Sequence, residues 1–269
     1  MSDFDLGPVV EPFKTLAGTF PDQTAYPFDD FRVEWGPIFH RGRLDGTARV
    51  LVIGQDPGQH ENILRRILVG EAGRRTQGLL AKLGITKSYV MINALLYSVY
   101  GSGGAKYVDD APVAAYRNKW IDGIMASGKV EGVITLGQMA KKAWEVWKAT
   151  PTGAASTVLA QHLTHPTQPE SAGKTKAERE QLTKTMLQGW DAAVVALRPA
   201  INHPDQPIPA GLYGNAFAVA DKPDIPSFDL PAGIPAWMYD DDGWAKRVGA
   251  TPQKKRASIA ITVPAGIIP

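Results

Sequence analysis

Short apolar runs alternate, between residues 50 and 197, with stretches that repeat apolar residues at helical spacing. The runs predict four strands: Val50–Ile53, Tyr89–Leu96, Val130–Leu136 and Thr157–Leu163. The stretches predict helices at Glu61–Leu68, around Leu79, Leu80 and Leu83, and at Pro112–Ala126, Met139–Trp147 and Lys176–Leu197. Because this alternation is typical of a parallel sheet with helices on both faces, we expect an α/β fold with three layers, α/β/α, around a mainly parallel four-stranded sheet.

The composition differs on both sides of this alternating region. Residues 1–47 are rich in turn formers and aromatic residues, so we assign them to the same domain, 1–198, as a segment that wraps the sheet. Residues 199–269 hold 11 of the 21 prolines but also several aromatic residues, which argues against plain disorder. We interpret them as an irregular, ordered tail packed on the core, and a role in a dimer contact is an equal alternative.

Polar or glycine residues stand at or near the carboxyl end of each predicted strand. They are Asp56, Asn93, Gly137 and His165. The carboxyl ends of parallel strands form the edge at which α/β proteins place their ligand sites, so the coincidence predicts a site there. Taken singly, each residue has a structural alternative: Asp56 can cap the following helix, and a buried Asn93 can tie down a loop.

The overall composition limits the chemistry. The chain has 269 residues, a net charge of +2 and no cysteine, which excludes disulfides, thiolate metal sites and cysteine-ligated iron–sulfur clusters. We expect no cofactor and no metal. No apolar run reaches membrane-spanning length and the N-terminus lacks a signal pattern, so we expect a cytoplasmic protein without a membrane partner.

With so small a net charge, any acidic partner must be bound by local basic patches. One candidate patch is formed by arginines between residues 61 and 87, where only two glutamates oppose the cations: Arg65, Arg66, Arg74 and Arg75. These arginines predict phosphate contacts, and the alternative is a solvated helix face. The backbone amides that follow Gly137, at Gln138, begin a helix and are a second candidate for phosphate binding.

Two motifs resemble those of the uracil-DNA glycosylase superfamily, over about Arg49–Leu197. Gly54-Gln55-Asp56-Pro57 resembles its first motif, G-Q-D-P-Y-H, and the segment from His165 to Ser171, H-P-T-Q-P-E-S, resembles its second, H-P-S-P-L-S. The resemblance implies that Asp56 positions a water molecule and offsets the positive charge of the sugar, and that His165 stabilises the departing base. It also implies that Asn93, whose amide both donates and accepts, reads the imide edge of uracil.

The chain departs from the family pattern at two positions that would contact the base. The tyrosine after G-Q-D-P, which in the family rejects thymine, is Gly58 here, and a stacking phenylalanine is replaced by Leu68. We therefore place Gln55, Gly58, Leu68 and Asn93 in the base pocket and expect a wider substrate range. His60 is displaced by one position from the motif histidine, which leaves its role open.

These features predict a monofunctional DNA glycosylase that removes uracil, together with 5-substituted uracils or xanthine, and starts base excision repair. The partner would be DNA that contains such bases, with further contacts from Thr167, Ser171 and Lys174; the oligomeric state is left open. The rival is a non-catalytic binder of damaged or abasic DNA, against which the presence of both Asp56 and His165 argues. An unrelated nucleotide-binding protein is disfavoured because no Walker or Rossmann glycine pattern occurs.

Overall fold

The computed structural model describes residues 4–101, 103–239, 243–251, 254–255 and 258–267. Its α-helices are α1 (Phe13–Gly18), α2 (Gln59–Leu64), α3 (Glu71–Ala81), α4 (Ala111–Met125), α5 (Gln138–Lys148), α6 (Pro151–Ala155), α7 (Gln168–Ala172) and α8 (Lys176–Leu197). Its strands are β1 (His40–Gly42), β2 (Val50–Gly54), β3 (Tyr89–Asn93), β4 (Gly132–Leu136), β5 (Leu159–Leu163), β6 (Ala245–Arg247) and β7 (Ile259–Ile261). None of the described helices is both long and apolar enough to cross a membrane.

The central sheet has the order β1-β3-β2-β4-β5 and is mainly parallel, as the alternation predicts. It contains five strands rather than four, because β1 adds to one edge, antiparallel to β3, with His40 opposite Ile92. This strand has only three residues and the sequence H-R-G, so it carries no apolar run by which a sequence pattern could reveal it.

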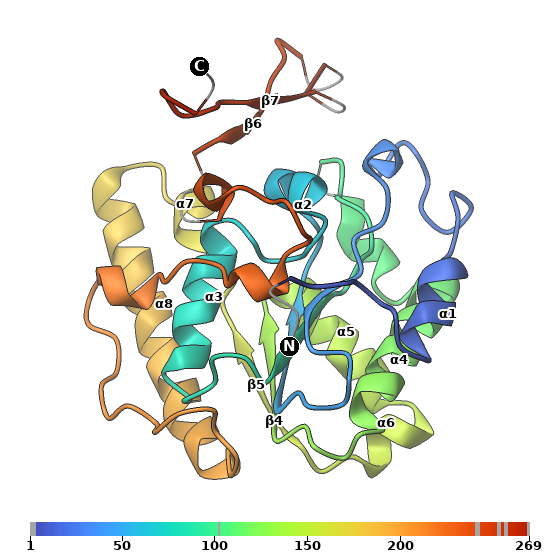
Figure 1. Cartoon of the computed structure of the whole chain (residues 1–269), viewed down its shortest axis with the longest axis vertical. Coiled ribbons are helices and arrows are strands. Elements are labelled where there is room, and N and C mark those ends of the chain that lie inside the picture. The colour runs from blue at the N-terminus through green and yellow to red at the C-terminus, as the bar shows by residue number, and fades with distance from the viewer. Residues whose placement is uncertain (1–3, 102, 240–242, 252–253, 256–257, 268–269) are drawn as a thin grey trace.

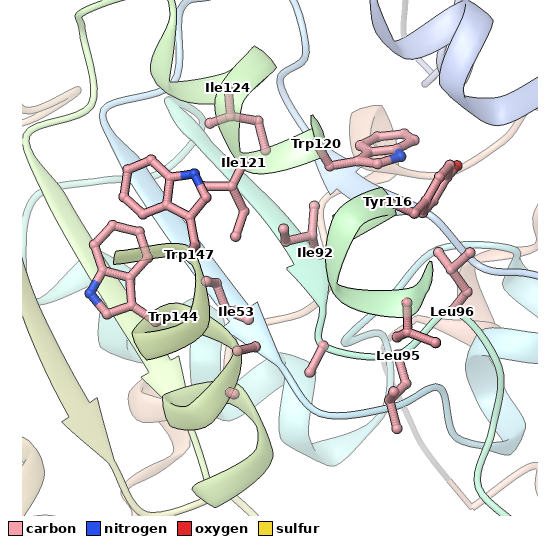
Figure 2. Packing of buried hydrophobic residues seen from close by; sticks show 14 of the residues in the cluster. Ile53, Ile92, Leu95, Leu96, Tyr116, Trp120, Ile121, Ile124, Trp144 and Trp147 are labelled. Carbon is pink, nitrogen blue, oxygen red and sulfur yellow. The ribbon is translucent and has the colours of Figure 1, made fainter. Parts of the chain in front are cut away.

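Helices cover both faces of the sheet (Figure 1). Along β2, Leu51 and Ile53 pack into one core cluster while Val50 and Val52 pack into the other. The first cluster lies under α4 and α5, with Trp120, Trp144 and Trp147 among its buried rings (Figure 2); the second lies under α3 and α8. The two-residue period of a strand therefore places the apolar run in two cores at once, as expected for a sheet covered on both faces.

The predicted helix Glu61–Leu68 is wrong in its second half. α2 ends at Leu64, and the chain then turns through Arg65 (φ 58°) and Leu68 (φ 52°), both in the left-handed region. The turn is held in place because the Arg65 guanidinium donates to the carbonyl oxygens of Trp35 (2.7 Å) and Pro37 (2.8 Å). By contrast, Lys176–Leu197 is helical over its whole predicted length and begins with a capping box, in which Thr175 pairs with Glu178.

The described residues after 198 run through short 3₁₀ turns and include the two strands of the β6–β7 hairpin. Asp229 of this segment is fully buried, where it accepts a hydrogen bond from the Tyr89 hydroxyl and lies 3.5 Å from Arg41 Nη1. Asp205 accepts from the backbone amides of Thr86 and Lys87, both at 2.7 Å. These contacts join the segment to strands β1 and β3 and to the turn before β3.

Candidate active site

The sheet order places the polar strand ends next to one another. Strands β3, β2, β4 and β5 are parallel neighbours, so Asn93, Gln55–Asp56, Gly137 and His165 follow each other along the carboxyl edge of the sheet. The Gly137 amide donates to the carbonyl of Leu163 at 2.8 Å, which ties the end of β4 to the end of β5. The structure therefore brings the four residues to one edge of the sheet, the edge at which α/β proteins place their ligand sites.

The Asp56 carboxylate is held by the loop that follows β3. Its Oδ2 accepts a hydrogen bond from the Val99 amide at 2.9 Å. Burial raises the pKa of Asp56 to about 6, although this hydrogen bond and the positive charges of Arg247 and Arg32 act in the opposite direction. Asp56 is therefore an anion at neutral pH in a site that desolvates it, and such an anion interacts strongly with a nearby positive charge.

Asp56 does not cap the following helix, which was its structural alternative. The N-cap of α2 is Gly58, whose amide donates to Glu61 Oε2 at 2.9 Å. Gly58 has φ −91° and ψ −169°, an extended conformation open to any residue. A Cβ at this position would lie 2.7 Å from Glu61 Oε2, the end of a flexible side chain that can move aside. Larger residues are therefore compatible with the backbone at position 58.

Asn93 lies across Gly54, with which it pairs in the β2–β3 register. A Cβ on Gly54 would be 2.3 Å from Asn93 Oδ1 and 3.7 Å from Leu68 Cδ1, so only glycine leaves room for the amide here. Asn93 and Leu68 are 7% and 5% exposed. The left-handed backbone of Leu68 is costly for a residue with a Cβ, by about 1–2 kcal/mol, and it turns this side chain toward the end of β2.

Gln55 is positioned by Gly137 and by the first turn of α5. Gly137 has φ +90°, and a Cβ there would lie 2.8 Å from Gln55 Cδ, so both its backbone conformation and its surroundings require glycine. Gln55 Oε1 accepts from the Met139 amide at 3.4 Å. The carboxamide thus occupies part of the helix start that the sequence predicts as a phosphate site, while Gln138 is exposed beside it.

His165 follows β5 and is neutral at physiological pH. Burial, together with the positive charge of Arg75, lowers its pKa to about 4. Its Nδ1 accepts a hydrogen bond from the Thr167 amide at 3.3 Å and lies 3.2 Å from Thr167 Oγ1. Because Nδ1 accepts from an amide, the proton of the neutral ring is on Nε2, which makes Nε2–H a donor.

A pocket of about 660 Å³ opens beside His165. It includes Gln55, Gly137, Gln138 and Ser171 of the predicted site residues, but Asp56, Asn93, Leu68 and Gly58 are not among its lining residues. The pocket also contains Lys141, on α5, and His162, on β5, neither of which was singled out in the sequence. As an edge strand, β5 exposes His162, whose Nδ1 lies 2.7 Å from Thr135 Oγ1. The polar pair Gln161-His162 within the strand was the available signal.

The four arginines predicted to contact phosphates do not form an open patch. Arg66 and Arg75 are 8% and 7% exposed and are paired within the chain: Arg66 Nε lies 2.6 Å from Asp5, and Arg75 Nη2 lies 2.7 Å from Glu170. Arg65 is bound to two backbone carbonyls, and Arg74 Nη2 donates to the Lys222 carbonyl at 3.1 Å. A buried guanidinium needs such partners, so Arg66 and Arg75 are not free to bind a phosphate. Arg65 is exposed and Arg74 is half-buried, and a DNA contact of these two stays a prediction.

Arg75 has a different place in the site. Besides its ion pairs, it donates to the Pro166 carbonyl at 2.6 Å and so holds the backbone beside His165. Ser171 and Lys174 are exposed on α7 and in the loop that follows it, whereas Thr167 contacts His165 itself. The His60 ring packs edge-on against Trp244, with centroids 5.0 Å apart.

The fold and the site together define an α/β protein with a desolvated carboxylate and a neutral histidine along one sheet edge, after β2 and β5, with β4 between these strands. Among the described residues, no group of three or more histidine, cysteine or acidic side chains could hold a metal ion. The family model described as the uracil DNA glycosylase superfamily matches residues 41–188, more than half of the chain. The chain therefore belongs to the uracil DNA glycosylase superfamily. A comparison with curated protein sequences gave no significant match.

Proposed function

We propose that this protein is a monofunctional DNA glycosylase that hydrolyses the N-glycosidic bond of uracil in DNA and starts base excision repair. The observation that carries the proposal is that Asp56 and His165 lie along the same sheet edge, the first as an anion and the second as a neutral donor, which are the protonation states that the reaction needs. Base release passes through a transition state in which the sugar becomes cationic and the base anionic. The sugar therefore needs a nearby negative charge, and the base needs a hydrogen-bond donor.

Each residue has a defined part in this proposal. The Asp56 carboxylate faces the cationic sugar and orients the water that attacks it, so the product is an abasic site. The Nε2–H of His165 donates to an oxygen of the leaving base and stabilises its negative charge. Asn93 hydrogen-bonds the edge of the base after it has left the stack. Water is the nucleophile, and no cofactor takes part.

The wider substrate range is part of the proposal. Gly58 leaves open the space that a tyrosine would fill against C5 of a pyrimidine, which supports excision of 5-substituted uracils or of xanthine in addition to uracil. Leu68 replaces an aromatic ring that would stack on the base, and this loses about 0.5–1.5 kcal/mol of stacking, so uracil excision should be slower than in relatives with both rings.

The test is release of free base from oligonucleotides that carry uracil, hypoxanthine, xanthine or thymine. Wild type should release uracil, and Asp56→Asn should keep DNA binding while losing at least about 100-fold in single-turnover rate, because it removes the charge and keeps the shape. Near-normal turnover of Asp56→Asn would contradict its assignment. Binding of uracil-containing or abasic DNA by wild type without release of any base would instead favour the non-catalytic binder.

A further inference from the structure

The C-terminal hairpin lies outside the residues matched to the superfamily, and it sits beside the Asp56 loop. Figure 1 shows β6 and β7 beyond α2 and α7, the helices that follow β2 and β5. The hairpin is anchored there, because Gln59 Nε2 donates to the Ala245 carbonyl at 2.7 Å and Trp244 packs against His60. Trp244 and Ala245 are 4% and 1% exposed, so the base of the hairpin is firmly docked on α2.

Arg247, the last residue of β6, reaches an aromatic ring beside the site. Its Cζ lies 5.8 Å from the centre of the Trp35 ring, and Arg32 Cζ lies 5.2 Å from the same ring. Arg32 also donates to the Val99 carbonyl, while the Val99 amide donates to Asp56. Two arginines, one from the N-terminal segment and one from the hairpin, thus converge next to the candidate catalytic carboxylate.

This convergence places two positive charges close together, and the carboxylates of Asp56 and Glu34 act on Arg32 in the opposite direction to Arg247. Arg32 is 5% exposed, and burial, with the positive charge of Arg247, lowers its pKa to about 10. Arg247 is exposed on the surface of β6. The guanidinium groups of Arg32 and Arg247, which contact the same tryptophan ring, repel each other. An anion bound to the solvent-exposed side of Arg247 would reduce this repulsion.

The rest of the hairpin has the same sign of charge. From residue 243 to the end, the sequence has five cations and no acidic residue. The described cations are all exposed: Lys246, Arg247, Lys254 and Lys255. Arg256 and the three aspartates 240–242, which precede this segment, lie outside the described residues. A two-stranded ribbon fits a DNA groove, and the cations on β6 and at Lys254 and Lys255 have the charge that binds its flanking phosphates.

We propose that the C-terminal hairpin is a DNA-binding arm in which Arg247 contacts a backbone phosphate at the rim of the Asp56 site. The inference rests on the proposed function, since it takes DNA as the substrate. The arm would hold the duplex on one side of the site while the target base leaves the stack. Such contacts are independent of sequence, so they act on undamaged and damaged DNA alike.

The experiment measures DNA binding at several salt concentrations by fluorescence anisotropy. It uses a short undamaged duplex and the same duplex carrying one uracil. Each lost phosphate contact should reduce the slope of log affinity against log salt by about 0.9, so Arg247→Gln should flatten it by about that amount on both duplexes. The pair Lys254→Gln/Lys255→Gln should flatten it further. Arg247→Lys, which keeps the charge, should restore most of the slope.

The matched control is Lys129→Gln. Lys129 is exposed but precedes β4, at the opposite edge of the sheet, so its loss should leave the slope unchanged. The proposal is overturned if Arg247→Gln and the double lysine variant keep the wild-type slope and affinity. It is also overturned if sedimentation shows a dimer that Arg247→Gln dissociates, because the hairpin would then serve a second copy of the chain.

The proposed function and the arm can fail separately. Release of uracil by wild type, with a salt slope unaffected by Arg247→Gln, would remove the arm and leave the glycosylase. An arm-dependent slope without release of any base would leave the arm and remove the glycosylase. Absence of DNA binding by wild type would contradict both.

Discussion

Base release should lose activity as the pH falls through about 6, because the active form of Asp56 is the carboxylate. Burial raises the pKa of this group to about 6, so one pH unit below that value only about one-tenth of the protein carries the anion. The single-turnover rate at pH 5 should therefore be about tenfold lower than at pH 7.5. His165, with its pKa lowered to about 4, stays neutral over this range and does not contribute to the change.

Two substitutions should move the acid limb, the fall in rate as the pH drops through about 6, in opposite directions. Glu61 raises the pKa of Asp56 by its negative charge, so Glu61→Gln should shift the limb to lower pH while its amide oxygen still accepts from Gly58. Arg247 lowers the pKa of Asp56 by its positive charge, so Arg247→Gln should shift the limb to higher pH. A shift caused by unfolding would have the same sign in both variants.

The assay is single-turnover release of uracil with protein in excess, measured from pH 4.5 to pH 8.5, with DNA binding followed in parallel. Binding and rate must be separated because protonation of other groups also changes affinity for DNA. A rate that stays near its neutral-pH value down to about pH 5, as the ordinary aspartate pKa of 3.8 would give, would refute the desolvation of Asp56. If the rate falls with a midpoint near pH 6 and neither Glu61→Gln nor Arg247→Gln shifts that midpoint, the titrating group is not Asp56.

Three further outcomes are expected. His165→Ala should lower the single-turnover rate about 100-fold. His203 of the C-terminal segment is exposed and pairs with Glu131, so His203→Ala should change the rate little. The reverse result would show that the second motif is misplaced. Gly58→Tyr should lower excision of 5-hydroxymethyluracil relative to uracil, and refusal of every 5-substituted base by wild type would contradict this explanation. Asp229→Ala should destabilise the protein by about 3–5 kcal/mol in urea unfolding, because it leaves Arg41 buried without its carboxylate, and a loss below about 1 kcal/mol would show that the ion pair contributes little.

The sequence by itself determined the elements whose signals are local. The apolar run of β2 and the full length of α8 follow from side-chain periodicity and from the capping residues Thr175 and Glu178, which act within a few residues of the chain. It also determined the sheet edge of the site, because alternating strands and helices force a parallel sheet and thereby bring Asp56, Asn93 and His165 to the same edge.

The tertiary structure alone decided which charges are available. Arg66 and Arg75 look like DNA contacts in sequence, but their partners Asp5 and Glu170 lie 61 and 95 residues away, and only the folded chain brings them into contact. Edge strand β1 is invisible in sequence for the same reason, since it is defined by pairing with β3 and not by a pattern of its own. Burial makes an unpaired charge costly, so a buried arginine needs a partner wherever in the chain the fold provides one. The position of that partner leaves no local signal in the sequence around the arginine.

The same principle placed Arg247 beside Asp56. Nothing near residue 247 in sequence indicates a site that begins at residue 54, and the connection arises because Trp244 and Ala245 bury their surfaces on α2. Local chemistry thus set the strand ends and their polar residues, whereas packing of the N-terminal segment and the C-terminal hairpin against them set the electrostatic surroundings of the carboxylate.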